Sequence, residues 1–170
     1  MKQPVHPLYK RFPPSESCSC DICTSYCLRP GWPLVQEARM AIGNGQANRL
    51  MIEFSTDYAF GILVPAFRGN EGLYALDIYS HNGCTFLTSS GCLIFETRYR
   101  PLECCFCHHA RNGLGLSCHL QIARDWNTSK GKRLVQRWLA MQHLKYPRSF
   151  TEIISGEMKH RVAERPFGQG

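Results

Sequence analysis

The residues best able to do chemistry in this chain are its ten cysteines, which fall into two groups along the sequence. The first group has four thiols within ten residues and ends at Cys27, and the second begins at Cys84. Short C-x2-C spacings bring two soft donors to one ion, and a closed site then needs further donors from elsewhere in the chain. Two separated groups of soft ligands therefore predict that the chain folds around a metal.

Seven cysteines make up the predicted metal-binding set. They form a C-x2-C-x3-C run in the first group and four thiols in the second, namely Cys20, Cys23, Cys27, Cys84, Cys92, Cys104 and Cys107. Such a set can serve two tetrahedral zinc ions or one iron–sulfur cluster, and spacing alone leaves both metals open. The front run differs by one residue from the bacterial ferredoxin spacing, and Leu28 stands where that motif has proline.

Other soft side chains lie beside the set, and the sequence leaves their roles open. Adjacent histidines do not easily bind one ion together, so at most one of His108 and His109 is expected to be a ligand. The remaining candidates are Cys18, Cys105, Cys118 and His119. For each single cysteine or histidine, a buried thiol or a hydrogen-bonded imidazole is the competing interpretation.

The order and flanks of the cysteines resemble the bacterial zinc/iron-chelating cysteine-cluster family (YkgJ-like). The similar segments lie between residue 20 and about residue 107. They are Cys20-x2-Cys23-x3-Cys27, Trp32-Pro33-Leu34 with a helix carrying Glu37-Ala38, Cys84-x-Phe86-Leu87, Gly91-Cys92-Leu93-Ile94-Phe95-Glu96 and Arg100-Pro101-Leu102-x-Cys104. The resemblance implies that the matched cysteines chelate zinc or an iron–sulfur cluster, and it implies no particular activity. Two positions depart from the family pattern: Leu28 replaces the second cysteine of a usual pair, and Cys105 replaces a usual arginine.

Charge and hydropathy bear on compartment and partners. The formal net charge is +7, and much of the basic character follows Lys130. Basic segments bind nucleic acid or acidic proteins, although they are more often a solvated helix face, so protein and nucleic-acid partners both stay open. No apolar leader and no run of membrane-spanning length occurs, so we expect a cytoplasmic protein with no membrane partner. In a reducing compartment metal binding is favoured over disulfides; the alternative is a secreted disulfide protein whose signal was removed.

The elements expected to position the cysteines are short strands and several helices, an α+β fold in one small domain pinned by one or two cysteine metal sites. We divide the chain into an extended arm (1–17), a cysteine-cluster metal-binding domain (18–145) and a basic tail (146–170). The front cysteines are expected in tight turns, and a hairpin-like loop is expected over 83–95. Strands are expected over 51–54, 60–64 and 73–79, and helices over 34–42, from a cap at Ser117 and from a cap at Thr128.

Three functions compete at this point. The first is a metal-binding protein with an accessory or redox role. The second is a metal-dependent or redox enzyme that uses an open metal position or a surplus thiol such as Cys105 or Cys118. The third is a nucleic-acid-binding module built on the basic C-terminal helices. No Ser/His/Asp order, P-loop or dinucleotide-binding glycine motif appears, so common hydrolase and nucleotide-binding classes gain no support.

Overall fold

The computed structural model describes residues 5–163 and the side chains up to Gly156. It is an α+β fold of helices around two short antiparallel sheets. The α-helices are α1 (Leu8–Arg11), α2 (Asp21–Leu28), α3 (Val35–Gly43), α4 (Leu102–Phe106), α5 (Gly115–Trp126), α6 (Ser129–Met141) and α7 (Phe150–Ala163). The strands are β1 (Leu50–Phe54), β2 (Gly61–Pro65), β3 (Leu87–Thr88) and β4 (Gly91–Cys92). Three 3-10 turns complete the order, η1 (Ala47–Arg49), η2 (Asp77–Asn82) and η3 (His109–Arg111).

The hairpin of β1 and β2 runs through the centre of the core. The two strands pair antiparallel from Leu50 opposite Pro65 to Phe54 opposite Gly61. Every residue of β2 is buried, which explains why this strand is a continuous apolar run instead of an alternating one. The predictions over 51–54 and 60–64 are confirmed: β1 begins one residue earlier than expected, and β2 is shifted by one residue.

The third predicted strand, over 73–79, is wrong. Tyr74 makes a single parallel bridge to Ile52, and the chain then turns into η2. The pairing with β1 uses the carbonyl of Leu73 and the N–H of Ala75, and it ends because the chain turns into η2 at Asp77. The buried side chain of Asn70 bonds backbone groups that face away from β1. Its amide nitrogen donates to the carbonyl of Tyr74 (2.7 Å), and its amide oxygen accepts from the N–H of Leu76 (2.8 Å).

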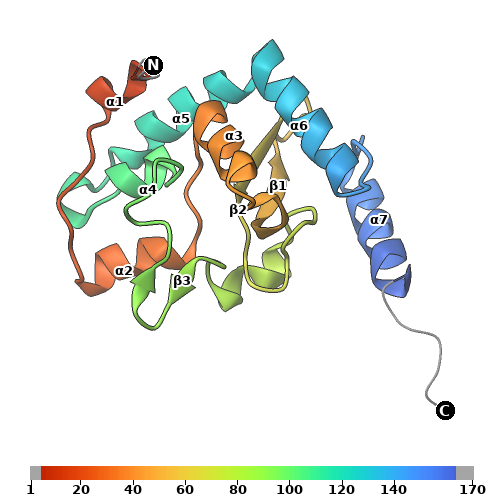
Figure 1. Ribbon diagram of the computed structural model, residues 1–170, viewed down its shortest axis with the longest axis horizontal. Helices are drawn as coiled ribbons and strands as arrows, with labels where there is room; N and C mark the ends of the chain where they lie inside the picture. Colours follow the sequence, from red (N-terminus) through yellow and green to blue (C-terminus); the bar gives the residue numbers. More distant parts are fainter. Residues whose placement is uncertain (1–4, 164–170) are drawn as a thin grey trace.

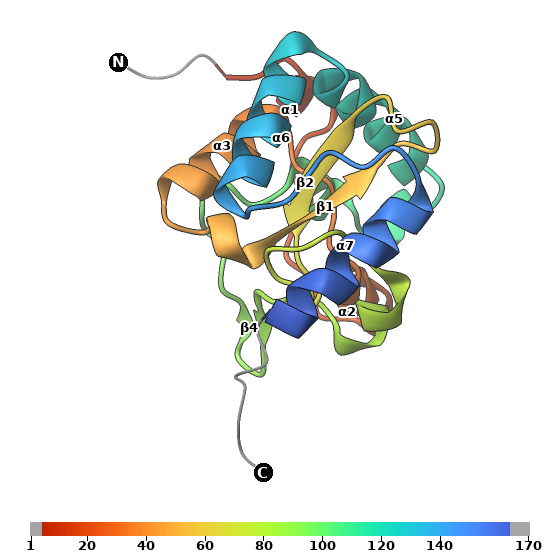
Figure 2. The same cartoon turned by 90° about the vertical axis from the view of Figure 1, so that its right-hand side faces the viewer.

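Helices α3, α5 and α6 enclose the central hairpin (Figures 1 and 2). Trp126 and Trp138 are fully buried between these elements. The predicted cap of α6 is confirmed, since the Thr128 hydroxyl accepts from the N–H of Gly131 (3.2 Å). The predicted start of α5 is wrong by several residues. That helix begins at Gly115, so Ser117 lies inside it and does not cap it.

The N-terminal arm is folded back onto the domain instead of being extended throughout. It contains the turn α1, and Phe12 is buried against Phe106 with the two ring centroids 5.2 Å apart. The guanidinium of Arg111 donates to the carbonyl of Pro13 (2.6 Å). These contacts bring the end of the arm close to η3, and that approach builds the site described below.

Helix α2 and the β3–β4 hairpin lie together along the lower edge of the molecule in Figure 1, away from the ends of α3 and α6. The hairpin predicted over 83–95 is confirmed, with Ser89 and Ser90 as its two-residue loop and Gly91 at a φ of 116°. Helix α2 and strand β4 carry Cys23, Cys27 and Cys92. At the opposite side α7 packs near Tyr74; the tail predicted over 146–170 is helical from Phe150 to Ala163. Within residues 5–163, none of the helices combines the length and apolar character needed to cross a membrane.

Candidate metal centre

The structure brings three thiols and one imidazole to a single point. The sulfurs of Cys18, Cys20 and Cys23 and a ring nitrogen of His109 all lie within 4.8 Å of one another. The Nδ1 atom of His109 is 3.5 Å from the sulfur of Cys18 and 3.4 Å from those of Cys20 and Cys23. Three thiolates and one imidazole are an established donor set for tetrahedral metal sites. This group, called the thiol–imidazole cluster below, can hold a metal ion.

The start of α2 presents two of the four donors. Cys20 is the N-cap of this helix, and Cys23 lies one turn further on. Residues three apart on a helix share a face, so the C-x2-C spacing aims both sulfurs the same way. The expectation of tight turns is therefore wrong for this run, and a single helical turn satisfies the same spacing.

The other two donors are Cys18, two residues before Cys20, and His109, from a distant part of the chain. Cys18 ends the folded arm, which is held where the N–H of Ser15 donates to the carbonyl of Cys105 (2.8 Å). His109 opens η3, and its own N–H donates to the sulfur of Cys23 (3.3 Å). The cluster therefore joins the end of the arm and the start of α2 to η3, which lies far along the sequence.

Local electrostatics divides the thiols of the cluster. The backbone N–H of Cys23 is the main cause that lowers the pKa of the Cys20 thiol to about 7. Burial raises the pKa of the Cys23 thiol itself. The thiolate is the metal-binding form, so Cys20 is partly ionised near neutral pH without a metal, whereas Cys23 loses its proton when a cation binds.

Cys27 does not join this cluster, although the sequence placed it in the same run. It lies four residues after Cys23 on α2, which is about 6 Å further along the helix axis. Burial is the main cause that raises the pKa of its thiol, the neighbouring Cys92 adds to the rise, and Arg100 opposes it. Cys27 therefore belongs with the thiols of the second group.

A second set of thiols surrounds a cavity of about 100 Å³ between α2, the β3–β4 hairpin and α4. Its members influence the pKa values of one another. Burial is the main cause that raises the pKa of Cys84, and the neighbouring thiols Cys92 and Cys27 raise it further. Burial is also the main cause that raises the pKa of Cys104, and Cys84 raises it further. We call Cys27, Cys84, Cys92 and Cys104 the cavity thiols. Cys107 also lines this cavity.

Burial dominates the chemistry of the cavity thiols. It raises the pKa of Cys84 to about 11 and that of Cys104 well above its ordinary value. The N–H of Gly31 points at the sulfur of Cys104 (3.3 Å) and opposes this rise. Such thiols stay protonated near neutral pH unless a cation supplies positive charge, because a coordinating thiol is deprotonated by its metal.

The structure distributes the seven predicted ligands over two places. Cys20 and Cys23 lie in the thiol–imidazole cluster, and the other five line the cavity, which Cys18 and Cys23 also border. The cluster is completed by Cys18 and His109, whose roles the sequence left open. The C-x-C spacing was a signal for Cys18. The only sequence signal for His109 as a ligand was its position next to His108, and nothing in the sequence showed which of the two histidines would bind.

The two thiols considered for catalysis are poorly suited to it. Burial is the main cause that raises the pKa of Cys105 to about 11 and that of Cys118 to about 12. Cys118 is also completely buried. Since the thiolate is the nucleophile, both groups remain neutral thiols near pH 7, and their surroundings give no support to an enzyme that uses a surplus thiol.

A cleft of about 350 Å³ opens beside the cavity and shares Cys104 with it. In this cleft the Glu103 carboxylate accepts from the N–H of Trp32 (2.6 Å) and lies 2.8 Å from the Nδ1 atom of His119. The His119 ring stacks on the Trp32 indole, whose N–H donates to Glu53 (2.8 Å). These contacts hold α4, α5 and β1 together, and they order the wall that carries Cys104.

Comparison of the chain with protein-family profiles, with curated proteins and with solved structures finds no match. The resemblance to the YkgJ-like family therefore stays a prediction carried by the spacing of the cysteines. The case for a function consequently depends on the geometry of the chain's own residues.

Proposed function

We propose that the protein binds zinc at the thiol–imidazole cluster, and that this ion pins the N-terminal arm and η3 to the start of α2. The observation that carries the proposal is the convergence of three sulfurs and one imidazole nitrogen within 4.8 Å. Donors from the segment Cys18–Cys23 and from η3 meet at this point, so a bound ion would act as a cross-link between them. In sites of this kind metal affinity contributes directly to folding stability.

The spacing of the donors supports a single ion over an iron–sulfur cluster at this position. Zn–S and Zn–N bonds of about 2.3 and 2.0–2.1 Å at a tetrahedral angle place sulfur and nitrogen about 3.6 Å apart. The separations from His109 Nδ1 are 3.4 to 3.5 Å. The protein ligands of a four-iron cluster bind separate irons and so stand further apart than the ligands of one ion.

The cavity thiols are proposed as a second centre. Four thiolates are the donor set of all-cysteine zinc sites and of iron–sulfur clusters alike, so chemistry alone permits either occupant. Support for a metal comes from four sulfurs that line one cavity, where a cation would remove the cost of ionising them. Within the described residues these sulfurs do not form a group within 4.8 Å of one another as the thiol–imidazole cluster does. The proposed role is that of a metal-binding accessory protein, with redox activity if this second centre holds a cluster.

Metal and acid-labile sulfide analysis of anaerobically purified protein, with a visible spectrum, tests the proposal. Zinc at the thiol–imidazole cluster predicts at least one zinc per chain. An iron–sulfur cluster at the cavity would add brown absorbance and about four irons and four sulfides per chain, and a second zinc would leave the protein colourless. A protein that contains no zinc after purification with zinc present refutes the first centre.

A matched pair of histidine variants localises the ion. His109→Ala removes a donor and should lower zinc content by one ion per chain. His108→Asn is the control, because His108 lies next in sequence, accepts from the N–H of Ala110 and is outside the cluster. Asparagine keeps a capping oxygen at that position. Equal zinc content in the two variants would contradict the assignment of His109 as a ligand.

A further inference from the structure

A groove of about 350 Å³ lies where α3 packs against α6, on the far side of the core from the hairpin β3–β4 (Figures 1 and 2). Its walls carry four positively charged side chains. Arg39 comes from α3, and α6 contributes Lys130, Arg133 and Arg137. All four are exposed. The groove contains no residue of the thiol–imidazole cluster or of the cavity.

Helical spacing explains why three cations share one wall. Lys130, Arg133 and Arg137 stand at positions i, i+3 and i+7, which form a stripe along one face and span about 10 Å of helix. The buried face of α6 carries Val135 and Trp138, which anchor the helix in the core. The stripe is therefore held on a rigid element and points outward.

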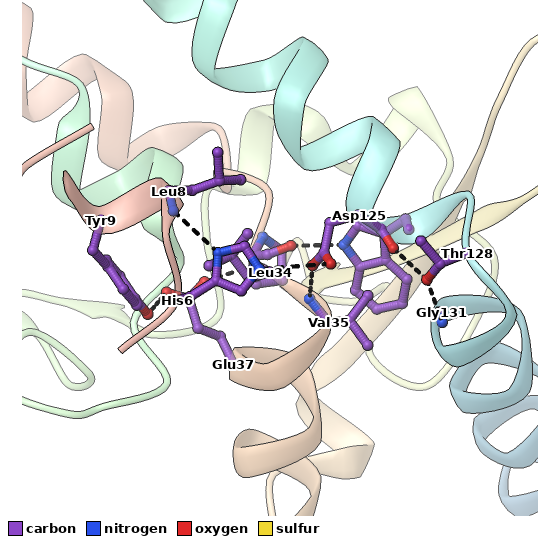
Figure 3. Close-up of polar contacts among 11 residues, drawn as sticks. His6, Leu8, Tyr9, Leu34, Val35, Glu37, Asp125, Thr128 and Gly131 are labelled. Carbon is purple, nitrogen blue, oxygen red and sulfur yellow. Dashed lines mark hydrogen bonds and ion pairs between the residues drawn. The ribbon is translucent and has the colours of Figure 1, made fainter. Parts of the chain in front are cut away.

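The positive charges of the groove are not neutralised within the part of the chain that the structure describes. There, none of the four cations forms an ion pair or a side-chain hydrogen bond. The carboxylate of Asp125 also lines the groove, but one of its oxygens accepts from the N–H of Val35 (2.8 Å). Its other oxygen lies 3.8 Å from the Nε2 atom of His6, as Figure 3 shows. Both oxygens of the Asp125 carboxylate therefore already have partners other than the four cations of the groove.

We propose that this groove binds the phosphate backbone of a nucleic acid. Unpaired, exposed arginine and lysine side chains arranged along one helix are the electrostatic footprint of such binding, and the chain carries a net charge of +7. No aromatic side chain of the described residues lines the groove apart from the His6 imidazole, so bases have no stacking platform of Phe, Tyr or Trp there. Binding is therefore to phosphates and independent of sequence. This activity is separate from the proposed metal binding and goes beyond it.

Fluorescence anisotropy with a short labelled DNA duplex of arbitrary sequence, and with the RNA duplex of the same sequence, measures the predicted affinity. Four phosphate contacts predict a slope of about −3.6 for log K against log salt concentration, which is a loss of about 150-fold between about 50 and 200 mM salt. In the full-length metal-loaded protein, Arg133→Gln combined with Arg137→Gln should make the slope less negative by about 1.8.

Lys132→Gln is the matched control. Lys132 is an exposed residue of α6 that does not line the groove, so removing its charge should leave the slope unchanged. Zinc content and thermal unfolding of each variant show that the fold is intact. An equal effect of Lys132→Gln and of a single groove substitution overturns the proposal, as does no salt-dependent binding. Poly-glutamate and unlabelled DNA are compared as competitors at equal charge concentration. If poly-glutamate displaces the duplex equally well, the proposal is overturned in favour of an acidic protein partner.

Discussion

Replacing Glu37 with glutamine tests whether one buried carboxyl makes folding stability depend on pH. The carboxyl is fully buried. One of its oxygens accepts from the N–H groups of Leu34 (2.7 Å) and Leu102 (2.9 Å), and the other accepts from the Tyr9 hydroxyl. Figure 3 shows the contacts to Tyr9 and Leu34. Glutamine can keep this arrangement, because its single carbonyl oxygen can accept both amides while its NH2 group faces the tyrosine.

The magnitude follows from the pKa of this group. Burial is the main cause that raises the pKa of Glu37 from 4.5 to about 7 in the folded protein. A raised pKa means that the folded state binds the proton more tightly than the unfolded chain does. The stabilisation is fully present below about pH 4.5 and is lost as the pH rises to about 7. Between about pH 5.5 and pH 8 the loss is about 2 kcal/mol.

The assay is urea unfolding of both proteins at several pH values across this range, with metal content checked at each. The free energy of unfolding of Glu37→Gln minus that of the unsubstituted protein should rise by about 2 kcal/mol from the lowest to the highest pH. The exposed Glu96 gives the control, and Glu96→Gln should show no such rise. A difference for Glu37→Gln that is flat with pH would refute the reasoning.

Two further substitutions test how the cavity and α6 are held. A methyl group added at Gly31 would stand 2.8 Å from the sulfur and 2.9 Å from the backbone nitrogen of Cys104. Gly31→Ala should therefore lower the free energy of unfolding by about 1–3 kcal/mol and reduce metal uptake at the cavity thiols. Unchanged melting and metal content would contradict this close contact. Thr128→Ala removes the cap of α6 and should lower the free energy of unfolding by about 1 kcal/mol in urea titrations, whereas Thr128→Ser should restore it.

The sequence predicted correctly those elements that depend on residues close together in the chain. The apolar runs of β1 and β2 and the cap at Thr128 are each specified within a few residues, so the sequence located them to within one position. The strand expected over 73–79 is limited to a single bridge because the chain turns into η2 at Asp77. The side chain of Asn70, outside that run, bonds the backbone of Tyr74 and Leu76 on the side away from β1. A side chain that stands in the place of a neighbouring strand is not visible in the periodicity of the segment it bonds.

By itself the sequence predicted that soft donors are plentiful enough for metal, and it grouped Cys20 with Cys23, because a C-x2-C spacing brings two donors to one ion. Only the tertiary structure decided the partition of the donors. Cys27 is one helical turn beyond Cys23, and this separation assigns it to the cavity thiols. Cys18 and His109 are 91 residues apart and meet because the arm packs against the α4–η3 segment. Such approaches depend on the packing of the whole core, which spacing along the chain does not encode.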